Sequence, residues 1–223
     1  MDSPKRALLL VASPKASNST SESLGTYLLE KLANSGFVTQ TAHVQTLMRS
    51  DAGQQAMLEL VKASDLIILS FPLYVDSLPA AAIKALEHIA QGQREMNTSK
   101  KHRLVAIVNN GFPEASQNST AIAICKQFAS EANFEWAGGL GLGGGGAIGG
   151  KPLKQVGSIA RNARKALDLA AADLLEDKPV SKEAANLMAK QLVPKWLYLA
   201  IGNRSWKQQA KAFGSQNKLY DQP

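Results

Sequence analysis

The residues best suited to chemistry lie near the start of the chain, in a loop rich in hydroxyl side chains. An apolar segment, residues 7–12, leads directly into this loop, and a helical pattern begins at Thr20. The start of a helix has unpaired backbone N–H groups and partial positive charge, so it attracts phosphate. We therefore predict a donor-rich phosphate site in this loop, with Lys15 as an added cation. Its hydroxyl and amide residues are Ser13, Ser17, Asn18, Ser19, Thr20 and Ser21.

The same loop has a simpler interpretation as a helix cap. Ser19 and Glu22 fit the S-x-x-E pattern of a capping box, which helices use with no ligand present. The loop matches neither the Walker pattern nor an early G-x-G-x-x-G. Taken alone, it leaves phosphate binding and ordinary capping as open alternatives.

Apolar segments alternate with helical patterns along most of the chain. Strands are expected at residues 7–12, 37–47 (an edge strand), 65–71, 103–108 and 134–138, and helices at 20–34, 52–63, after Pro79, 117–132 and 159–175. This alternation predicts a parallel sheet with helices on both faces. Ligands of such sheets bind beyond the carboxyl ends of the strands, near the switch point. That rule indicates the loops after the first, third and fourth strands.

The second and third of these loops combine aromatic, apolar and amide residues. The candidate ligand contacts are Pro72, Leu73, Tyr74 and Val75 in the second loop, and Asn109, Asn110, Gly111 and Phe112 in the third. Apolar and aromatic walls favour flat aromatic ligands, because ring burial and stacking supply most of their affinity. The alternative is that Tyr74 and Phe112 are hydrophobic plugs that cover the end of the sheet.

These motifs resemble those of the flavodoxin-like NAD(P)H-dependent FMN reductases and NAD(P)H quinone reductases. Residues 13–19 are similar to the S-P-[RK]-x-x-S-N-S phosphate loop of that family, and residues 72–74 with Pro79 resemble its P-x-Y loop over the flavin. Residues 109–114 lie where the family has its third flavin loop. The resemblance covers residues 5 to about 150. The chain departs from the family pattern after Pro79, where it has alanines and the family commonly has a glycine.

The resemblance implies an α/β, three-layer flavodoxin-like fold with a five-stranded parallel sheet of order 2-1-3-4-5. It implies bound FMN, NAD(P)H as co-substrate, a small acceptor such as a flavin or quinone, and a homodimer. Because flavin N5 would carry the chemistry, it implies no catalytic side chain and no metal. The scattered His43, His88 and His102 agree with this expectation. The choice between NADH and NADPH, and the identity of the acceptor, stay open.

Two other functions are the alternatives to this reductase. A flavodoxin-type electron carrier would use the same fold and cofactor, but such carriers are usually acidic, and this chain has a formal charge of +7. A flavin-free interaction module would use the fold for contacts with other macromolecules, and the basic C-terminal third is its main support.

The net positive charge of the chain comes entirely from its last third. Residues 1–150 hold 12 basic and 12 acidic residues, whereas residues 151–223 hold 13 and 6. We expect a solvated surface and no nucleic-acid partner.

Residues 193–206 combine two tryptophans and a tyrosine with cations. A membrane-surface or partner-binding helix is the alternative there to a helix packed on the core or at a dimer face, which we favour.

Length and composition indicate one domain over residues 1–223. The resemblance implies that this domain is flavodoxin-like, with a core at about 5–150, and a helical, basic extension is expected at about 151–223. No apolar stretch approaches the length of a membrane-spanning helix. The single cysteine, Cys125, excludes an internal disulfide and is expected to be an inert core residue. A cytoplasmic protein is the simplest expectation.

A run of glycines at residues 138–150 contains G-x-G-x-x-G through its density alone. It lacks the following βαβ unit and acidic residue of a dinucleotide fingerprint. We therefore expect a flexible loop beside the flavin site or, as the less favoured alternative, a close backbone approach at a subunit contact.

Overall fold

The computed structural model describes residues 3–15, 17–96 and 101–215 of the 223-residue chain. Backbone contacts divide the chain into two compact units, residues 1–192 and 193–223. One domain over the whole chain, with an extension from about residue 151, stays a prediction.

The first unit is built on a parallel sheet whose five strands follow the order β2-β1-β3-β4-β5. This order confirms the predicted flavodoxin-like fold. The strands are β1 (Arg6–Val11), β2 (Val38–His43), β3 (Leu66–Pro72), β4 (Arg103–Asn109) and β5 (Glu135–Leu142). The central strands β1, β3 and β4 are almost entirely buried, which explains their uninterrupted apolar sequences.

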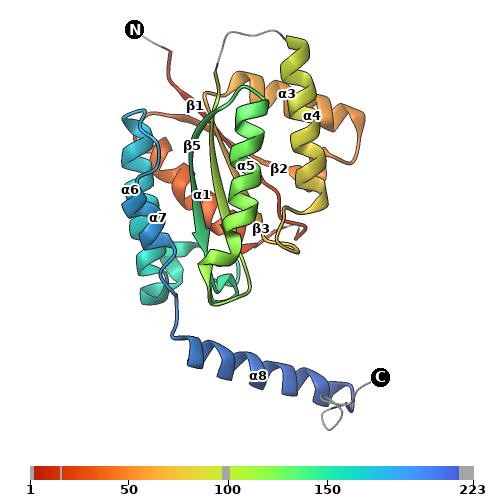
Figure 1. The fold of residues 1–223 in the computed structure, drawn as a ribbon, viewed down its shortest axis with the longest axis vertical. Coiled ribbons are helices and arrows are strands. Elements are labelled where there is room, and N and C mark those ends of the chain that lie inside the picture. Colours follow the sequence, from red (N-terminus) through yellow and green to blue (C-terminus); the bar gives the residue numbers. More distant parts are fainter. Residues whose placement is uncertain (1–2, 16, 97–100, 216–223) are drawn as a thin grey trace. The chain divides into compact units, whose positions relative to one another are not determined.

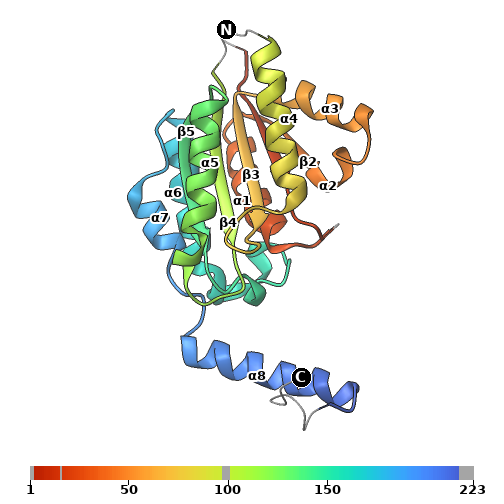
Figure 2. The same ribbon diagram turned by 45° about the vertical axis from the view of Figure 1, so that its right-hand side comes forward.

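Helices cover both faces of the sheet and complete three layers (Figures 1 and 2). On one face lie α1 (Thr20–Ala33) and α6 (Arg161–Leu175), which also contact each other. The opposite face is covered by α3 (Asp51–Ala63), α4 (Ala80–Met96) and α5 (Ser119–Glu131). Each helix turns an apolar face inward because it packs against one face of the sheet.

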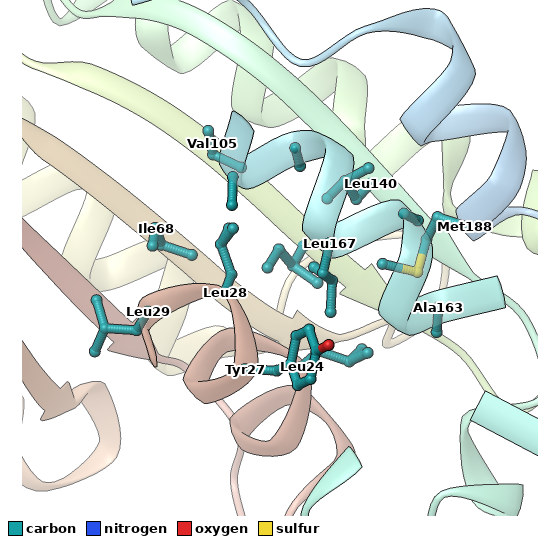
Figure 3. Close-up of a cluster of buried hydrophobic side chains, with 14 of the residues drawn as sticks. Leu24, Tyr27, Leu28, Leu29, Ile68, Val105, Leu140, Ala163, Leu167 and Met188 are labelled. Atoms are coloured by element: carbon teal, nitrogen blue, oxygen red, sulfur yellow. The ribbon is translucent and has the colours of Figure 1, made fainter. Parts of the chain in front are cut away.

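Successive residues of β1 point into two separate cores. Leu9 belongs to the cluster under α1 and α6, and Leu8 to the cluster under α3, α4 and α5. Figure 3 shows the first cluster, in which Leu28 of α1 and Leu167 of α6 meet Ile68 of β3. The two-residue period of the strand thus divides its side chains between both layers.

The predicted edge strand at residues 37–47 is correct only in its first half. β2 ends at His43, and α2 (Val44–Leu47) follows at once. Val44 is fully buried, and it faces the same core as Met57 of α3. Burial of Val44 therefore favours a helical turn at a position where the weak alternation of apolar and polar residues predicted a continuing strand.

β5 is longer than predicted and takes in the first glycines of the glycine run. A Cβ atom on Gly139 would lie 2.5 Å from the Ile122 side chain of α5, and one on Gly141 3.3 Å from Asn118. These glycines let α5 lie close to the sheet. The close backbone approach is therefore found within the chain, at an edge strand and its helix.

Shorter elements complete the chain. Four 3₁₀ turns, Ala115–Asn118, Gly145–Ala147, Leu153–Gln155 and Gly157–Ala160, lie between the regular elements of the first unit. α7 (Lys182–Met188) packs against α6. In the second unit the structure describes α8 (Lys195–Ala212). Across the described residues, no helix has both the length and the apolar character needed to cross a membrane.

Candidate functional site

The first loop, between β1 and α1, is held by its own polar groups. The buried Ser13 hydroxyl accepts a hydrogen bond from the Lys15 backbone N–H at 3.2 Å, and the Lys15 ammonium donates to the Asn18 carbonyl at 2.9 Å. Asn18 has a φ of 54°, a left-handed conformation that asparagine tolerates. The side chains of Ser17 and Asn18 are exposed. Pro14 and Lys15 are exposed as well, whereas Ser13 and Ser19 are buried.

The loop also caps α1. The Ser19 hydroxyl accepts a hydrogen bond from the backbone N–H of Glu22 at 3.1 Å, which confirms the capping interpretation for this residue. The Glu22 carboxylate instead lies 3.6 Å from the Nε2 atom of His43, so half of the capping box is present. The cap satisfies the N–H of Glu22 and leaves those of Thr20 and Ser21 as helix-start donors, which have no acceptor within the helix.

The second loop forms a tight turn after β3. The N–H groups of Tyr74 and Ser77 each donate to the other residue's carbonyl at 2.9 Å. Val75 and Asp76 at the tip have φ values of 46° and 58°. Tyr74 is 50% exposed and Val75 is 98% exposed, whereas Leu73 is half-buried. The turn thus leaves half of the Tyr74 side chain exposed after β3.

The third loop, after β4, is shaped by Asn110. Its amide oxygen accepts from the Phe112 N–H at 2.8 Å, and its amide nitrogen donates to the Glu114 carbonyl at 3.1 Å. The exposed Phe112 ring lies beside Gly111, where a Cβ atom would meet no other heavy atom within 4 Å. The amide of Asn110 therefore supports the loop, while Gly111 and Phe112 form its open surface.

Hydrogen bonds tie the three loops together at one edge of the sheet. The Ser21 hydroxyl donates to the Asn109 amide oxygen at 2.7 Å, and the Ser70 hydroxyl donates to the Ser21 carbonyl at 2.7 Å. The Leu73 N–H donates to the Asn109 carbonyl at 2.8 Å. One connected region at the β1/β3 switch point therefore contains the predicted contacts of all three loops. These are Ser13, Lys15 and Ser17–Thr20 in the first loop, Pro72–Val75 in the second and Asn109–Phe112 in the third.

The end of the glycine run lies against the first loop. The Thr20 hydroxyl donates a hydrogen bond to the Gly145 carbonyl at 2.8 Å. Gly150, with a φ of 76°, lies so close to the Asn18 carbonyl that a Cβ atom would be 1.6 Å from its oxygen. The Thr20 hydroxyl thus holds the glycine loop, and the glycines allow this close contact.

A hollow of about 420 Å³ adjoins Tyr74 and brings in residues that the sequence reasoning did not single out. Its lining joins Pro14 of the first loop and Tyr74 of the second to two cations, Arg49 and Lys84. Neither cation forms an ion pair within the described part of the chain. Arg49 follows β2 and α2, so the predicted place of β2 beside β1 is a signal that could have found it.

The histidines do not converge on this region. His43 faces Glu22, and His102 lies at the opposite end of β4, where its Nδ1 is 2.7 Å from the Ser64 carbonyl oxygen. Within residues 3–15, 17–96 and 101–215, no group of three or more metal-ligating side chains comes together. The chemistry available at the three loops is therefore hydrogen bonding, charge and aromatic contact.

Solved structures of three proteins share the fold. An FMN-dependent NADH-azoreductase from Bacillus anthracis, in complex with FMN, is 12% identical, with a TM-score of 0.52 over 76% of this chain and 99% of its own. A flavodoxin from Streptococcus pneumoniae is 13% identical, with a TM-score of 0.53 over 77% and 99%. An NAD(P)H:quinone oxidoreductase from Methanothermobacter marburgensis is 15% identical, with a TM-score of 0.53 over 77% and 94%. At these identities the likeness shows the fold alone.

Sequence comparison identifies the family. No curated protein matches the chain. A family profile described as flavodoxin-like fold matches residues 5–131, which is more than half of the chain and includes all three loops. The chain therefore belongs to this family of proteins with a flavodoxin-like fold.

Proposed function

We propose that the protein is an FMN-dependent oxidoreductase that uses NADH or NADPH to reduce a small acceptor such as a flavin or quinone. The observation that carries this proposal is the connection of three loops through Asn109 at the β1/β3 switch point. Each loop presents exposed residues of the type that FMN requires. Bound FMN would supply hydride transfer at N5 of its ring, which explains why no catalytic side chain is needed.

The residues present fit the two chemically different ends of FMN. The exposed side chains of Ser17 and Asn18, with the helix-start N–H groups of α1, suit the phosphate because donors at a helix start bind anions. Lys15 adds a positive charge. The exposed rings of Tyr74 and Phe112 suit a flat heteroaromatic ring system. We propose that the first loop binds the phosphate while the second and third loops bind the ring.

The hollow beside Tyr74 supports the pyridine-nucleotide part of the proposal. Arg49 and Lys84 place two positive charges on its wall, and Tyr74 connects it to the region proposed for the flavin ring. NADH and NADPH both carry a negatively charged pyrophosphate, which cations bind and orient. We propose that this hollow receives the nucleotide's phosphates and so directs the nicotinamide toward the flavin.

The named activities of two relatives support the same assignment. One is an FMN-dependent NADH-azoreductase and another an NAD(P)H:quinone oxidoreductase. A homodimeric, cytoplasmic enzyme stays part of the proposal, as the family resemblance implies.

Anaerobic rapid mixing tests the proposed reaction. Protein loaded with FMN is mixed with NADH or NADPH, and the visible absorbance of the flavin is followed before a quinone is added. We expect one nucleotide to bleach the absorbance within seconds and the quinone to restore it. Loaded protein that neither nucleotide bleaches would contradict a reductase and support the electron-carrier alternative.

A further inference from the structure

The helix of the second unit, α8, exposes large apolar side chains along one side. Trp196 and Trp206 are each 71% exposed, and Phe213, directly after the helix, is 86% exposed. Leu199, Trp206 and Phe213 recur at intervals of seven residues, so they lie along a single stripe. Trp196 precedes Leu199 by three residues and extends this stripe. Such an apolar face in water indicates an interaction surface.

Three cations run beside this apolar stripe. Arg204, Lys207 and Lys211 are spaced by three and four residues and line one shared hollow of about 470 Å³. None of the three forms an ion pair with any other described residue. The stretch Lys195–Ala212 contains no acidic residue at all. The three cations follow residues 203, 206 and 210, which lie on the same side of the helix as Leu199 and Trp206, so the charges run along one flank of the stripe.

We propose that α8 binds the surface of an anionic lipid bilayer, lying in the plane of the interface. Tryptophan prefers the level of the headgroups, where its ring is apolar and its N–H remains hydrated. Cations beside the apolar face meet lipid phosphates when such a helix lies flat. The cations in the second half of α8 oppose deeper insertion. This binding is separate from the proposed flavin chemistry and does not depend on it.

Charge favours a lipid surface over a second copy of the same helix. Two copies packed along their apolar stripes would bring cations together with no acidic residue of α8 to offset them. In addition, Asn203 lies within the stripe between Leu199 and Trp206 and interrupts a continuous apolar seam. An anionic bilayer instead attracts the flanking charges and buries the aromatic side chains.

Vesicle binding by the full chain tests this proposal. The probes are vesicles of phosphatidylcholine alone and of equal parts phosphatidylcholine and phosphatidylglycerol, with co-sedimentation and tryptophan emission as readouts. We expect binding to the anionic vesicles only, with a blue shift of the emission that added salt reverses. Two of the three tryptophans lie in α8, so a Trp196→Ala/Trp206→Ala variant should lose most of the shift.

A matched pair of variants separates this surface from general positive charge. Arg204→Gln/Lys207→Gln/Lys211→Gln should weaken binding about a hundredfold, roughly fivefold for each cation removed. The control is Lys62→Gln/Lys126→Gln/Lys165→Gln, which removes the same charge from exposed positions of the first unit and should leave binding unchanged.

Four results would overturn the proposal: no binding to anionic vesicles, equal binding to neutral ones, the same loss in both triple variants, or a size increase without vesicles that only the tryptophan variant abolishes. The last would assign the stripe to a second copy of the chain.

Discussion

At the scale of single residues, the turn that carries Tyr74 contains an unusual conformation. Val75 adopts a φ of 46° with its side chain in solvent. β-Branched residues are strained in the left-handed region, and such strain concentrates at binding sites. The two hydrogen bonds between Tyr74 and Ser77 hold the turn in place despite this cost. The strained residue thus lies directly beside a proposed flavin contact.

Relief of this strain should stabilise the protein. Val75→Asn should raise the free energy of unfolding by about 1 kcal/mol, because asparagine accepts a positive φ. Chemical denaturation measures the change. The control, Val38→Asn, replaces another exposed valine in ordinary extended backbone and should not stabilise. A loss of stability in Val75→Asn would show that the turn is not strained.

The two cations beside Tyr74 should affect nucleotide binding more than the chemical step. Arg49→Gln/Lys84→Gln should raise KM for NADH or NADPH by about tenfold or more, since charge-assisted hydrogen bonds contribute about 1.5–3 kcal/mol. The turnover rate at saturation should change little. Steady-state kinetics of the FMN-loaded protein measure both. Unchanged KM, with Lys62→Gln/Lys126→Gln as the charge control, would place the nucleotide elsewhere.

At the scale of elements, the glycine run matters through its contact with the first loop. Gly150 and Gly157 have nearly the same φ, 76° and 75°, but differ in their surroundings. A Cβ atom at Gly150 would collide with the Asn18 carbonyl, whereas at Gly157 it would meet open space. The comparison of the two positions separates the cost of backbone conformation from the cost of displacing the proposed phosphate loop.

An alanine at either position therefore gives a matched test. Gly157→Ala should cost about 1–2 kcal/mol of stability, the ordinary penalty of left-handed backbone, and leave FMN affinity unchanged. Gly150→Ala should cost more and weaken FMN binding at least tenfold, because Asn18 must move. Denaturation and FMN titration provide the two readouts. Equal effects on FMN affinity would mean that the glycine loop does not position the site.

Most elements could be predicted from the sequence because their signals are local. The strands 7–12, 65–71 and 103–108 are recognisable as uninterrupted apolar runs, and their alternation with helices implies a parallel sheet. Two boundaries could not be predicted, because tertiary contacts set them. The chain enters the helical turn α2 at Val44, which is buried in the same core as α3. β5 continues through glycines because side chains at those positions would collide with α5 and the residue before it. Propensity yields to packing in both cases.

The candidate site shows the same division. The three loops follow from strand order, but the roles of their side chains depend on partners far along the chain. In the sequence, nothing distinguishes Ser21 from the other hydroxyl residues of the first loop. In the fold, its hydroxyl donates a hydrogen bond to Asn109. The Thr20 hydroxyl donates a hydrogen bond to the Gly145 carbonyl. Arg49 lines the hollow beside Tyr74 only because β2, which precedes it, pairs with β1. Sequence thus predicts which loops form the edge, and the fold decides which side chains are structural.

At the scale of the whole molecule, the single cysteine makes stability depend on pH. Cys125 in α5 is fully buried, and desolvation raises its pKa to about 12. In the unfolded chain the thiol ionises near pH 8.5. Between these values the unfolded state binds fewer protons, so stability is full below about pH 8.5 and falls as pH rises through the window.

This linkage gives a measurable slope. Denaturation at several pH values between about 8.5 and 10 should show stability falling with pH, by at most about 1.4 kcal/mol per unit from this group. In Cys125→Ala that part of the slope should disappear. The folded protein should also resist thiol reagents until it unfolds. Rapid labelling of native protein would contradict the burial of this side chain.

Calorimetric titration with FMN and with riboflavin tests the central claim most directly, because the two ligands differ only in the phosphate assigned to the first loop. The account predicts that FMN binds much more tightly than riboflavin. Ser17→Ala and Ser19→Ala should each weaken FMN binding about tenfold or more. Ser50→Ala, which removes the matching cap of α3 where the Ser50 hydroxyl accepts from Gly53 at 3.2 Å, should leave the affinity unchanged. No uptake of FMN, or equal affinity for the two ligands, would contradict the account.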